Sequence, residues 1–249
     1  MLPAQRREQI LRTVRTGPAH VGDLATAFGV SEMTVRRDLH ELERDGKLTR
    51  VHGGAMRTVA EPAFAEIVIE RLEHKSRIGA LAADLVTDGQ TIMLDIGTTT
   101  LQLARHLRGR ELTVITSNLA AYEELLPEPS IELVLLGGIV RRNYRSLVGV
   151  LAEDALRQLR ADVAFLGASG IDGDDLSIVD TTMVEVPIKR AMMAAAARTV
   201  LLVDSAKFGM RGVVKVCDAT EVDALVTDDE VPPAAGEALT GAGVEVLIA

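Results

Sequence analysis

The sequence predicts an α/β protein in two parts, an N-terminal winged helix-turn-helix and a C-terminal, mainly parallel α/β domain. Basic residues collect in the first 58 residues, where a helix, turn and helix pattern precedes a basic strand. From residue 91 onward, short apolar strands alternate with helices. We therefore expect a winged helix-turn-helix over 1–58, a linker over 59–72 and an α/β domain over 73–249.

Charge is unevenly spread along the 249 residues, whose formal net charge is -9. Residues 1–58 contain 10 Lys and Arg against 7 Asp and Glu, a net +3, and the remainder contains 17 against 29, a net -12. We call residues 1–58 the head. Its positive charge, beside the negative charge of the remainder, indicates that only the head binds a polyanion.

Composition narrows the class of protein. The single cysteine, Cys217, excludes an intrachain disulfide and a cysteine-based zinc site, and it suits a reducing compartment. The N-terminal residues do not have the pattern of a signal peptide, and the apolar stretches fall short of the roughly 20 residues that span a bilayer. We therefore expect a cytoplasmic protein with no membrane partner, no cofactor and no metal site.

The head is predicted to be three helices followed by a wing. Apolar faces in "PAQRREQILRTVRTG" and "HVGDLATAFGV" predict the first two helices, and Gly29 supplies the turn after the second. Ser31 is the expected N-cap of the third helix. In that helix Val35, Leu39 and Leu42 recur at i, i+4 and i+7 as the buried stripe. "KLTRVHGGA" then predicts a basic strand and turn.

In a winged helix-turn-helix the third helix enters the major groove. We expect six DNA contacts from the polar side of this helix and from the wing: Ser31, Thr34, Arg36, Arg37, Arg50 and His52. Arginine pairs bidentately with guanine, and hydroxyls reach phosphates or base edges. The alternative for the two helix arginines is a solvated surface neutralised by Asp38 and Glu41. The N-cap, the buried stripe and the basic wing follow one another in the order of a winged helix-turn-helix, which favours DNA binding.

Residues 73–86 predict a helix after the linker, which contains the structure-breaking Pro62. His74 and Lys75 are expected on the linker surface, with an effector contact as the alternative. The strands of the following α/β domain end in five polar corners. These corners are "DIGTTT" at 95–100, "TSN" at 116–118, "GG" at 137–138, "GASGID" at 167–172 and "DSAKFG" at 204–209. Ligands of parallel α/β sheets bind at such strand ends.

The first corner has the residues of a phosphate-binding turn. Gly97 permits a tight turn, and the amides and hydroxyls of Thr98, Thr99 and Thr100 at a helix start can hold phosphate. A plain N-cap turn is the alternative. After the third corner, Arg141, Arg142 or Arg145 can supply positive charge.

The stretch "SEMTVRRDLHELERDGKLTRVHGGA" resembles the signature of the DeoR family of bacterial transcription regulators. The five corners also resemble that family's sensor, so the resemblance covers nearly the whole chain. It implies a sensor for phosphorylated sugars with a fold similar to ribose-5-phosphate isomerase. It also implies phosphate at Thr98 and Thr99, with Asp95, Asp172 and Lys207 around the sugar. The complete expected effector set is Asp95, Gly97, Thr98, Thr99, Thr100, Thr116, Asn118, Gly138, Arg141, Asp172, Lys189 and Lys207.

Two places depart from the family pattern or leave alternatives open. Ala206 stands where the family often has serine, which removes one hydroxyl. Pro187 is tolerated only in a first helical turn, so the late helix should begin near Val184 or Glu185. An i, i+4 surface ion pair of Glu185 with Lys189 is then one interpretation, and a sensor contact by Lys189 is the other.

We therefore expect a homo-oligomeric regulator, a dimer or tetramer, that represses a carbohydrate-catabolism operon. A phosphorylated sugar in the C-terminal domain would release it from a double-stranded DNA operator. The alternative is a sugar-phosphate isomerase-like enzyme with a DNA-binding head, in which Glu185, Asp172 and Lys207 would serve the reaction. We expect no catalytic residues.

Overall fold

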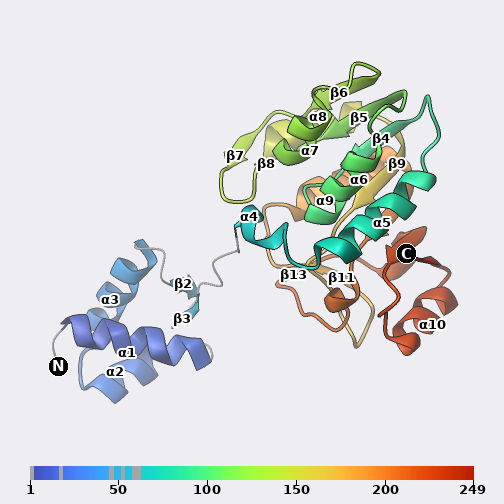
Figure 1. Ribbon diagram of the computed structural model, residues 1–249. Helices are drawn as coiled ribbons and strands as arrows, with labels where there is room; N and C mark the ends of the chain where they lie inside the picture. The colour runs from blue at the N-terminus through green and yellow to red at the C-terminus, as the bar shows by residue number, and fades with distance from the viewer. Residues whose placement is uncertain (1–2, 17–18, 45–47, 52–53, 58–62) are drawn as a thin grey trace. The chain divides into compact units, whose positions relative to one another are not determined.

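The computed structural model describes residues 3–16, 19–44, 48–51, 54–57 and 63–249 (Figure 1). The chain divides into two compact units, Met1–Pro62 and Ala63–Ala249. Residues 63–72, which the sequence assigns to the linker, belong to the second unit in this division. Each unit has its own hydrophobic core.

In its described residues the first unit contains three helices and three short strands. They are α1 (Pro3–Thr16), β1 (Ala19–His20), α2 (Val21–Phe28), α3 (Glu32–Arg44), β2 (Leu48–Val51) and β3 (Gly54–Arg57). The strands form an antiparallel sheet in the order β1-β3-β2. Val35, Leu39 and Leu42 are buried against α1 and α2, which confirms the predicted stripe. Gly29 ends α2 with φ of +63°, a conformation that favours glycine.

The second unit is built on a seven-stranded sheet in the order β15-β14-β12-β9-β4-β5-β6. Its strands are β4 (Thr91–Leu94), β5 (Leu112–Thr116), β6 (Ile131–Leu135), β9 (Ala161–Leu166), β12 (Ala196–Leu202), β14 (Ala224–Thr227) and β15 (Glu245–Ile248). Every neighbouring pair is parallel. The predicted α/β class with a mainly parallel sheet is therefore confirmed.

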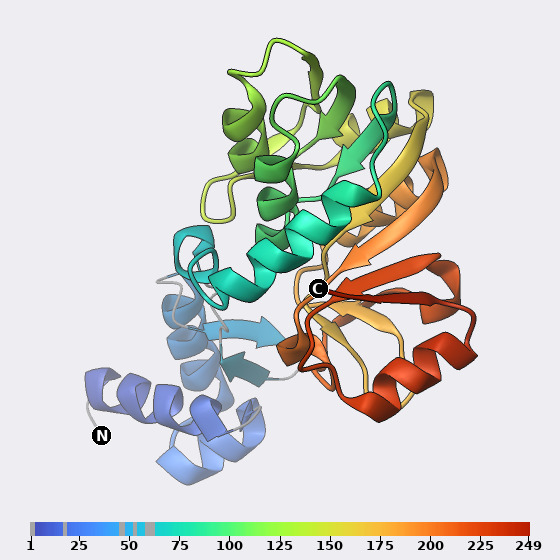
Figure 2. The ribbon, with the colours of Figure 1, turned by 45° about the vertical axis from the view of Figure 1, so that its right-hand side comes forward.

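Helices cover both faces of this sheet. They are α5 (Leu72–Asp84), α6 (Thr98–His106), α7 (Leu119–Leu125), α8 (Val150–Gln158), α9 (Val186–Ala195) and α10 (Pro233–Gly241), while the short helix α4 (Phe64–Ile67) packs on α6 and α7. Ile92 and Leu94 pack with Ile78 of α5, which crosses one face (Figure 2). Met93, between them in sequence, packs with Met192 of α9 in the other core cluster. The alternation follows from the two-residue period of a strand.

The chain changes direction across the sheet at β4. From β4 it passes to β5 and β6 on one side, and it later returns to β9 on the other side of β4. The carboxyl ends of β4 and β9 therefore form a switch point, the place where open α/β sheets bind ligands.

Smaller strands complete the second unit. A hairpin consists of β7 (Ile139–Arg141) and β8 (Ser146–Val148), and a three-stranded sheet has the order β10-β11-β13. The latter strands are Gly170–Ile171, Ile178–Asp180 and Val214–Cys217. Among the described helices, we find none with the length and apolar character of a membrane span.

Candidate DNA interface and effector site

The third helix of the head begins with the predicted cap. The Ser31 hydroxyl accepts a hydrogen bond from the Thr34 amide at 3.3 Å and lies 2.9 Å from the Thr34 hydroxyl. This bond satisfies one of the free amides in the first turn of α3. Both hydroxyls lie at the N-terminal end of the helix, which is the end that contacts base edges in helix-turn-helix proteins.

Asp38 and Glu41 of α3 make their shortest ion pairs with arginines of α1 rather than with Arg36 or Arg37. Asp38 is buried and lies 2.5 Å from Arg6 Nε and 3.7 Å from Arg7 Nε. Arg7 also pairs with Glu41 at 2.5 Å. Arg37 therefore lies 3.8 Å from a carboxylate that already has a partner, and its side chain is 84% exposed. The guanidinium of Arg37 remains directed toward solvent.

Arg36 pairs with Glu32, one turn earlier, at 2.8 Å on the exposed surface. Exposed pairs of this kind contribute at most about 1 kcal/mol, so guanine or phosphate can replace Glu32 at small cost. The two expected wing contacts are less fully defined. His52 lies outside the described residues, and Arg50 is placed in β2 while its side chain lies outside the description.

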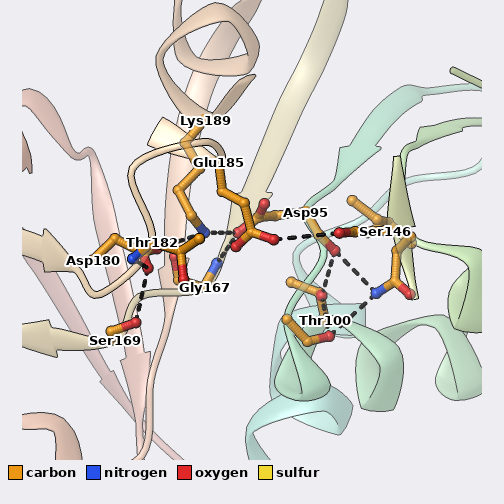
Figure 3. Close-up of polar contacts among 12 residues, drawn as sticks. Asp95, Thr100, Ser146, Gly167, Ser169, Asp180, Thr182, Glu185 and Lys189 are labelled. Atoms are coloured by element: carbon orange, nitrogen blue, oxygen red, sulfur yellow. Dashed lines mark hydrogen bonds and ion pairs between the residues drawn. The ribbon is translucent and has the colours of Figure 1, made fainter. Parts of the chain in front are cut away.

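In the second unit, Asp95 and Lys189 form a buried ion pair at the switch point (Figure 3). Asp95 follows β4, and Lys189 reaches it from α9. The Lys189 ammonium also donates to the Gly167 carbonyl at 2.8 Å, and the Gly167 amide donates to Asp95 Oδ2 at 2.9 Å. Gly167 follows β9, so this closed set of contacts joins α9 to the ends of both switch-point strands.

A second carboxylate completes this polar network. Asp180, at the end of β11, lies 3.6 Å from the Lys189 ammonium. Asp180 also accepts hydrogen bonds from the Ser169 hydroxyl at 2.9 Å and the Thr182 amide at 3.1 Å. Burial by itself lowers the pKa of Lys189, but attraction to Asp95 and Asp180 outweighs it, so the pKa is raised. Lys189 therefore remains an ammonium at neutral pH.

The expectation of a surface ion pair between Glu185 and Lys189 is wrong. Glu185 is buried, pairs with Arg141, and accepts a hydrogen bond from Ser146 at 3.3 Å. Glu185 and Lys189 both lie on the buried side of α9, where each meets partners from other elements. The predicted start of the helix is confirmed, because Glu185 is the N-cap of α9 and Pro187 lies in the first turn.

Three expected effector residues brace the loop after β4. The Thr100 hydroxyl lies 2.6 Å from the Asp95 carbonyl oxygen and 2.7 Å from that of Gly97. The Asn118 side-chain amide donates to the same two carbonyls at 3.3 Å, and its oxygen caps α7. The Thr116 hydroxyl donates to the last carbonyl of β4 at 2.7 Å. All three side chains are fully buried and fix the loop conformation.

This loop leads directly into α6. Gly97 is the N-cap, and within the described residues no side chain caps this end of the helix. Thr98 and Thr99 are the first helical residues, and both are largely buried. First-turn amides have no partner inside the helix and form the positive end of its dipole. The start of α6 therefore has the chemistry of an anion site.

Gly138 and Arg141 belong to the β7–β8 region. Gly138 has φ of +153°, and a Cβ there would lie 2.6 Å from the Val148 carbonyl oxygen. Hairpin packing alone therefore requires glycine at this position. The Arg141 guanidinium lies 5.6 Å from the centre of the Tyr144 ring and pairs with Glu185, so it connects the hairpin to α9.

Asp172 and Lys207 are on neighbouring segments. The Gly209 amide donates to the Ile171 carbonyl at 2.8 Å, which places the turn after Lys207 against the strand before Asp172. The Asp172 carboxylate accepts from the backbone amide two residues later at 2.9 Å. Among the described contacts, no hydrogen bond or ion pair joins either residue to Asp95.

Lys75 is not on the surface, which corrects the sequence interpretation. Its side chain is buried, and its ammonium donates to the Ile67 carbonyl at 2.8 Å. Burial lowers the pKa of Lys75, the Asp204 carboxylate opposes this shift, and the charge of Lys207 adds to it. Lysine is usually exposed on an amphipathic helix. The sequence pattern therefore did not reveal that Lys75 shares the buried side of α5 with Ile78.

His74 belongs to a cluster with metal-ligand spacing. Ligand atoms of His74, Asp228 and Glu230 lie within 4.8 Å of one another. Arg71 Nη2 lies 2.7 Å from Glu230 and 3.4 Å from Asp228. The guanidinium of Arg71 therefore neutralises the carboxylates that a metal ion would need.

Comparison with known proteins identifies both units. Residues 6–59 match the DeoR-like helix-turn-helix domain, and residues 70–229 match the DeoR C terminal sensor domain. The chain belongs to the DeoR family. This DeoR-family protein is a helix-turn-helix transcriptional regulator, and we call its second unit, Ala63–Ala249, the sensor unit.

Relatives of this DeoR-family chain match it along its whole length. The HTH-type transcriptional regulator YgbI of Escherichia coli is 36% identical over 100% of this chain and 99% of its own. GolR of Listeria innocua is 34% identical over 100% of each chain. The glycerol-3-phosphate regulon repressor of Escherichia coli is 32% identical over 96% of each chain. These names support a transcriptional regulator over the isomerase-like enzyme.

A solved structure of ribose 5-phosphate isomerase from Methanocaldococcus jannaschii is also similar. It is 21% identical, covers 54% of this chain and 53% of its own, and has a TM-score of 0.40. A likeness of this size has no bearing on the ligand or the reaction.

Proposed function

We propose that this DeoR-family regulator represses a carbohydrate-catabolism operon and that a phosphorylated sugar bound in its sensor unit releases it from DNA. The supporting observation is the buried Asp95–Lys189 pair together with the start of α6, which has no side-chain cap, at the switch point of the sheet. Relatives named as repressors agree with this role. They include the glycerol-3-phosphate regulon repressor and a putative aga operon repressor that is 32% identical.

The two ends of a sugar phosphate differ in chemistry, and so do the two parts of this site. The first-turn amides of α6, with Thr98 and Thr99, suit the phosphate. The carboxylates of Asp95 and Asp180 accept hydrogen bonds from hydroxyl donors. Lys189 offsets part of their negative charge, so the phosphate is less strongly repelled. Asp172 and Lys207, on two segments that adjoin each other, are the further contacts expected for the sugar.

Operator binding by this proposal requires more than one head. A dimer or tetramer places helix-turn-helix units on repeated half-sites, about one or more helical turns of DNA apart. Contacts to phosphate make the affinity fall with salt concentration. A chain that binds an operator in this way acts in the cytoplasm.

Phe64 connects the candidate effector site to the polypeptide that leads from the head. Its buried ring packs with Leu101 of α6 and Ala120 of α7. The Phe64 amide donates to the Asn143 carbonyl at 3.0 Å, and its ring meets the Tyr144 ring edge-on at 5.8 Å and 87°. A ligand that shifts the start of α6 therefore acts on the residues that hold Phe64.

The required coupling energy is modest. To weaken operator binding tenfold, the effector must bind the released state about 1.4 kcal/mol more favourably than the DNA-bound state. An edge-to-face aromatic pair such as Phe64 and Tyr144 is worth about 0.5–1.5 kcal/mol beyond its area burial, which is of the same order as this coupling.

A thermal-shift screen tests the effector assignment. Purified protein is heated with fructose 1-phosphate, glucose 6-phosphate, ribose 5-phosphate and glycerol 3-phosphate, each paired with its unphosphorylated counterpart. At roughly 100 times its Kd a ligand adds about 2.7 kcal/mol of stability. We expect a shift with one phosphorylated compound and none with its partner. Stabilisation by a free sugar to the same extent would contradict phosphate anchoring at α6.

A further inference from the structure

The side of α3 that faces away from the core contains one large apolar residue among polar and charged ones. Val35 and Leu39 mark the buried side of the helix. Met33, Arg37 and His40 recur at i, i+4 and i+7 on the opposite side, as the 3.6-residue period requires. Met33 is 72% exposed, the Arg37 side chain is 84% exposed, and His40 is also exposed.

A single exposed methionine is ordinary on a protein surface, but Met33 has a particular position. It is the second residue of α3, in the turn that Ser31 caps. The N-terminal residues of this helix are the ones that contact base edges in helix-turn-helix proteins. Met33 is therefore an unbranched, flexible apolar side chain on the outermost side of the DNA-contacting turn.

The acidic neighbours do not obstruct this surface. Asp38 is turned inward to Arg6, and Glu41 is bound to Arg7. Glu32 is held beside Arg36 at 2.8 Å. The exposed surface of the first two turns thus contains Met33, the guanidinium of Arg37 and the Arg36–Glu32 pair.

The major groove presents one apolar group, the C5 methyl of thymine, alongside hydrogen-bond donors and acceptors. We propose that Met33 contacts a thymine C5 methyl group and is a specificity-determining residue of the operator contact. This inference rests on the proposed binding of operator DNA by the head. It assigns to Met33 a preference for thymine at one position of each half-site, next to the base or phosphate that Arg37 contacts.

Removal of single methyl groups from the DNA tests this contact. The wild-type chain first selects its preferred duplex from a randomised pool, and each thymine of that duplex is then replaced individually by uracil. Uracil keeps every hydrogen-bonding group of thymine and lacks only the C5 methyl. We expect one uracil position per half-site to weaken wild-type binding about three- to fivefold, the size expected for one buried methyl group.

Protein variants combined with the two duplexes form a double-mutant cycle between Met33 and the thymine methyl group. Met33→Ala should bind the thymine and uracil duplexes equally at that position, and Met33→Leu should retain the difference. His40→Ala, on the same side of α3, is the matched control and should also retain it. Because all these side chains are exposed, the variants should melt at the wild-type temperature.

The possible failures are distinguishable. If a duplex is selected and the uracil penalty is the same in wild type and Met33→Ala at every position, the Met33 assignment is overturned while operator binding stands. If no sequence is enriched from the pool, operator recognition by the head is itself overturned, and the Met33 assignment fails with it.

Discussion

The Lys189 ammonium and the Asp95 carboxylate are bound to each other in the interior of the sensor unit, 94 residues apart in sequence. Their side chains are 3% and 1% exposed. Two charges removed from water in this way need each other and need hydrogen bonds to their remaining atoms. The Gly167 amide and carbonyl supply such bonds, one to each partner.

We expect Lys189→Met to destabilise the sensor unit by about 3–5 kcal/mol, because it leaves Asp95 and Asp180 buried without their cation. Urea unfolding measures this loss. The double variant Lys189→Met with Asp95→Asn should recover part of it. Equal stability of Lys189→Met and wild type would contradict the ion-pair assignment.

The pH dependence of this pair has a definite sign. The pKa of Lys189 is raised above its ordinary value of 10.5. The group therefore contributes its stabilisation fully below about pH 10.5, and the contribution is lost as the pH rises through the folded-state pKa. The alkaline loss of stability should be smaller in the double variant than in wild type, as unfolding measured from pH 8 upward would show.

Arg37→Ala should abolish specific operator binding while leaving effector binding and the melting temperature unchanged, because the side chain is 84% exposed. Gel-shift assays at two salt concentrations separate specific from non-specific binding. Arg211→Ala is the matched control, since Arg211 is 81% exposed in the sensor unit. Loss of operator binding in both variants would point to net charge rather than to recognition by Arg37.

Lys207→Ala should bind the operator normally and fail to release it when effector is added. Lys207 is half-buried in the "DSAKFG" corner at 204–209 of the sensor unit. It does not belong to the head, so its loss should leave the DNA contacts intact. Operator release is measured by fluorescence anisotropy against effector concentration. A wild-type release curve in this variant would refute the assigned role.

Phe64→Ala should bind effector with nearly wild-type affinity but lose most of the effect of effector on DNA binding. The ring packs with Leu101 and Ala120 and, as a hydrocarbon, offers no hydrogen-bonding group to a ligand at the start of α6. Removal of a buried phenylalanine also costs about 3–5 kcal/mol of stability, so Phe64→Leu is the control that preserves packing. The measurement that tests this route is the coupling factor, the ratio of operator Kd values with and without effector. A factor unchanged in Phe64→Ala would exclude this route.

Cys217 should behave as an inert thiol until the sensor unit unfolds. It is buried, and burial raises its pKa to about 12. The thiol is therefore protonated at pH 8, whereas the thiolate is the reactive form. Labelling with a disulfide reagent at pH 8 should follow the urea unfolding curve of the protein. Rapid labelling in native buffer would show instead that β13 opens locally.

The sequence determined the elements of the head because their signals are local. An N-cap hydroxyl, a stripe at i, i+4 and i+7 and a glycine at positive φ all act within one or two helical turns. In the structure Ser31 accordingly caps α3, Val35 is buried in the core of the head, and Gly29 ends α2. The parallel α/β class was equally predictable, because alternating apolar strands and helices have few ways to bury their surfaces.

Only the tertiary structure decided which polar side chains meet. Glu185 and Lys189 are one turn apart on α9, yet they bind Arg141 and Asp95 respectively, from distant segments. Burial in a low-dielectric interior makes each charge take the partner that the fold brings within reach, and sequence spacing does not encode that distance. The same holds for Lys75. Its position in the sequence suggested an exposed side chain, but the packing of α5 buries it.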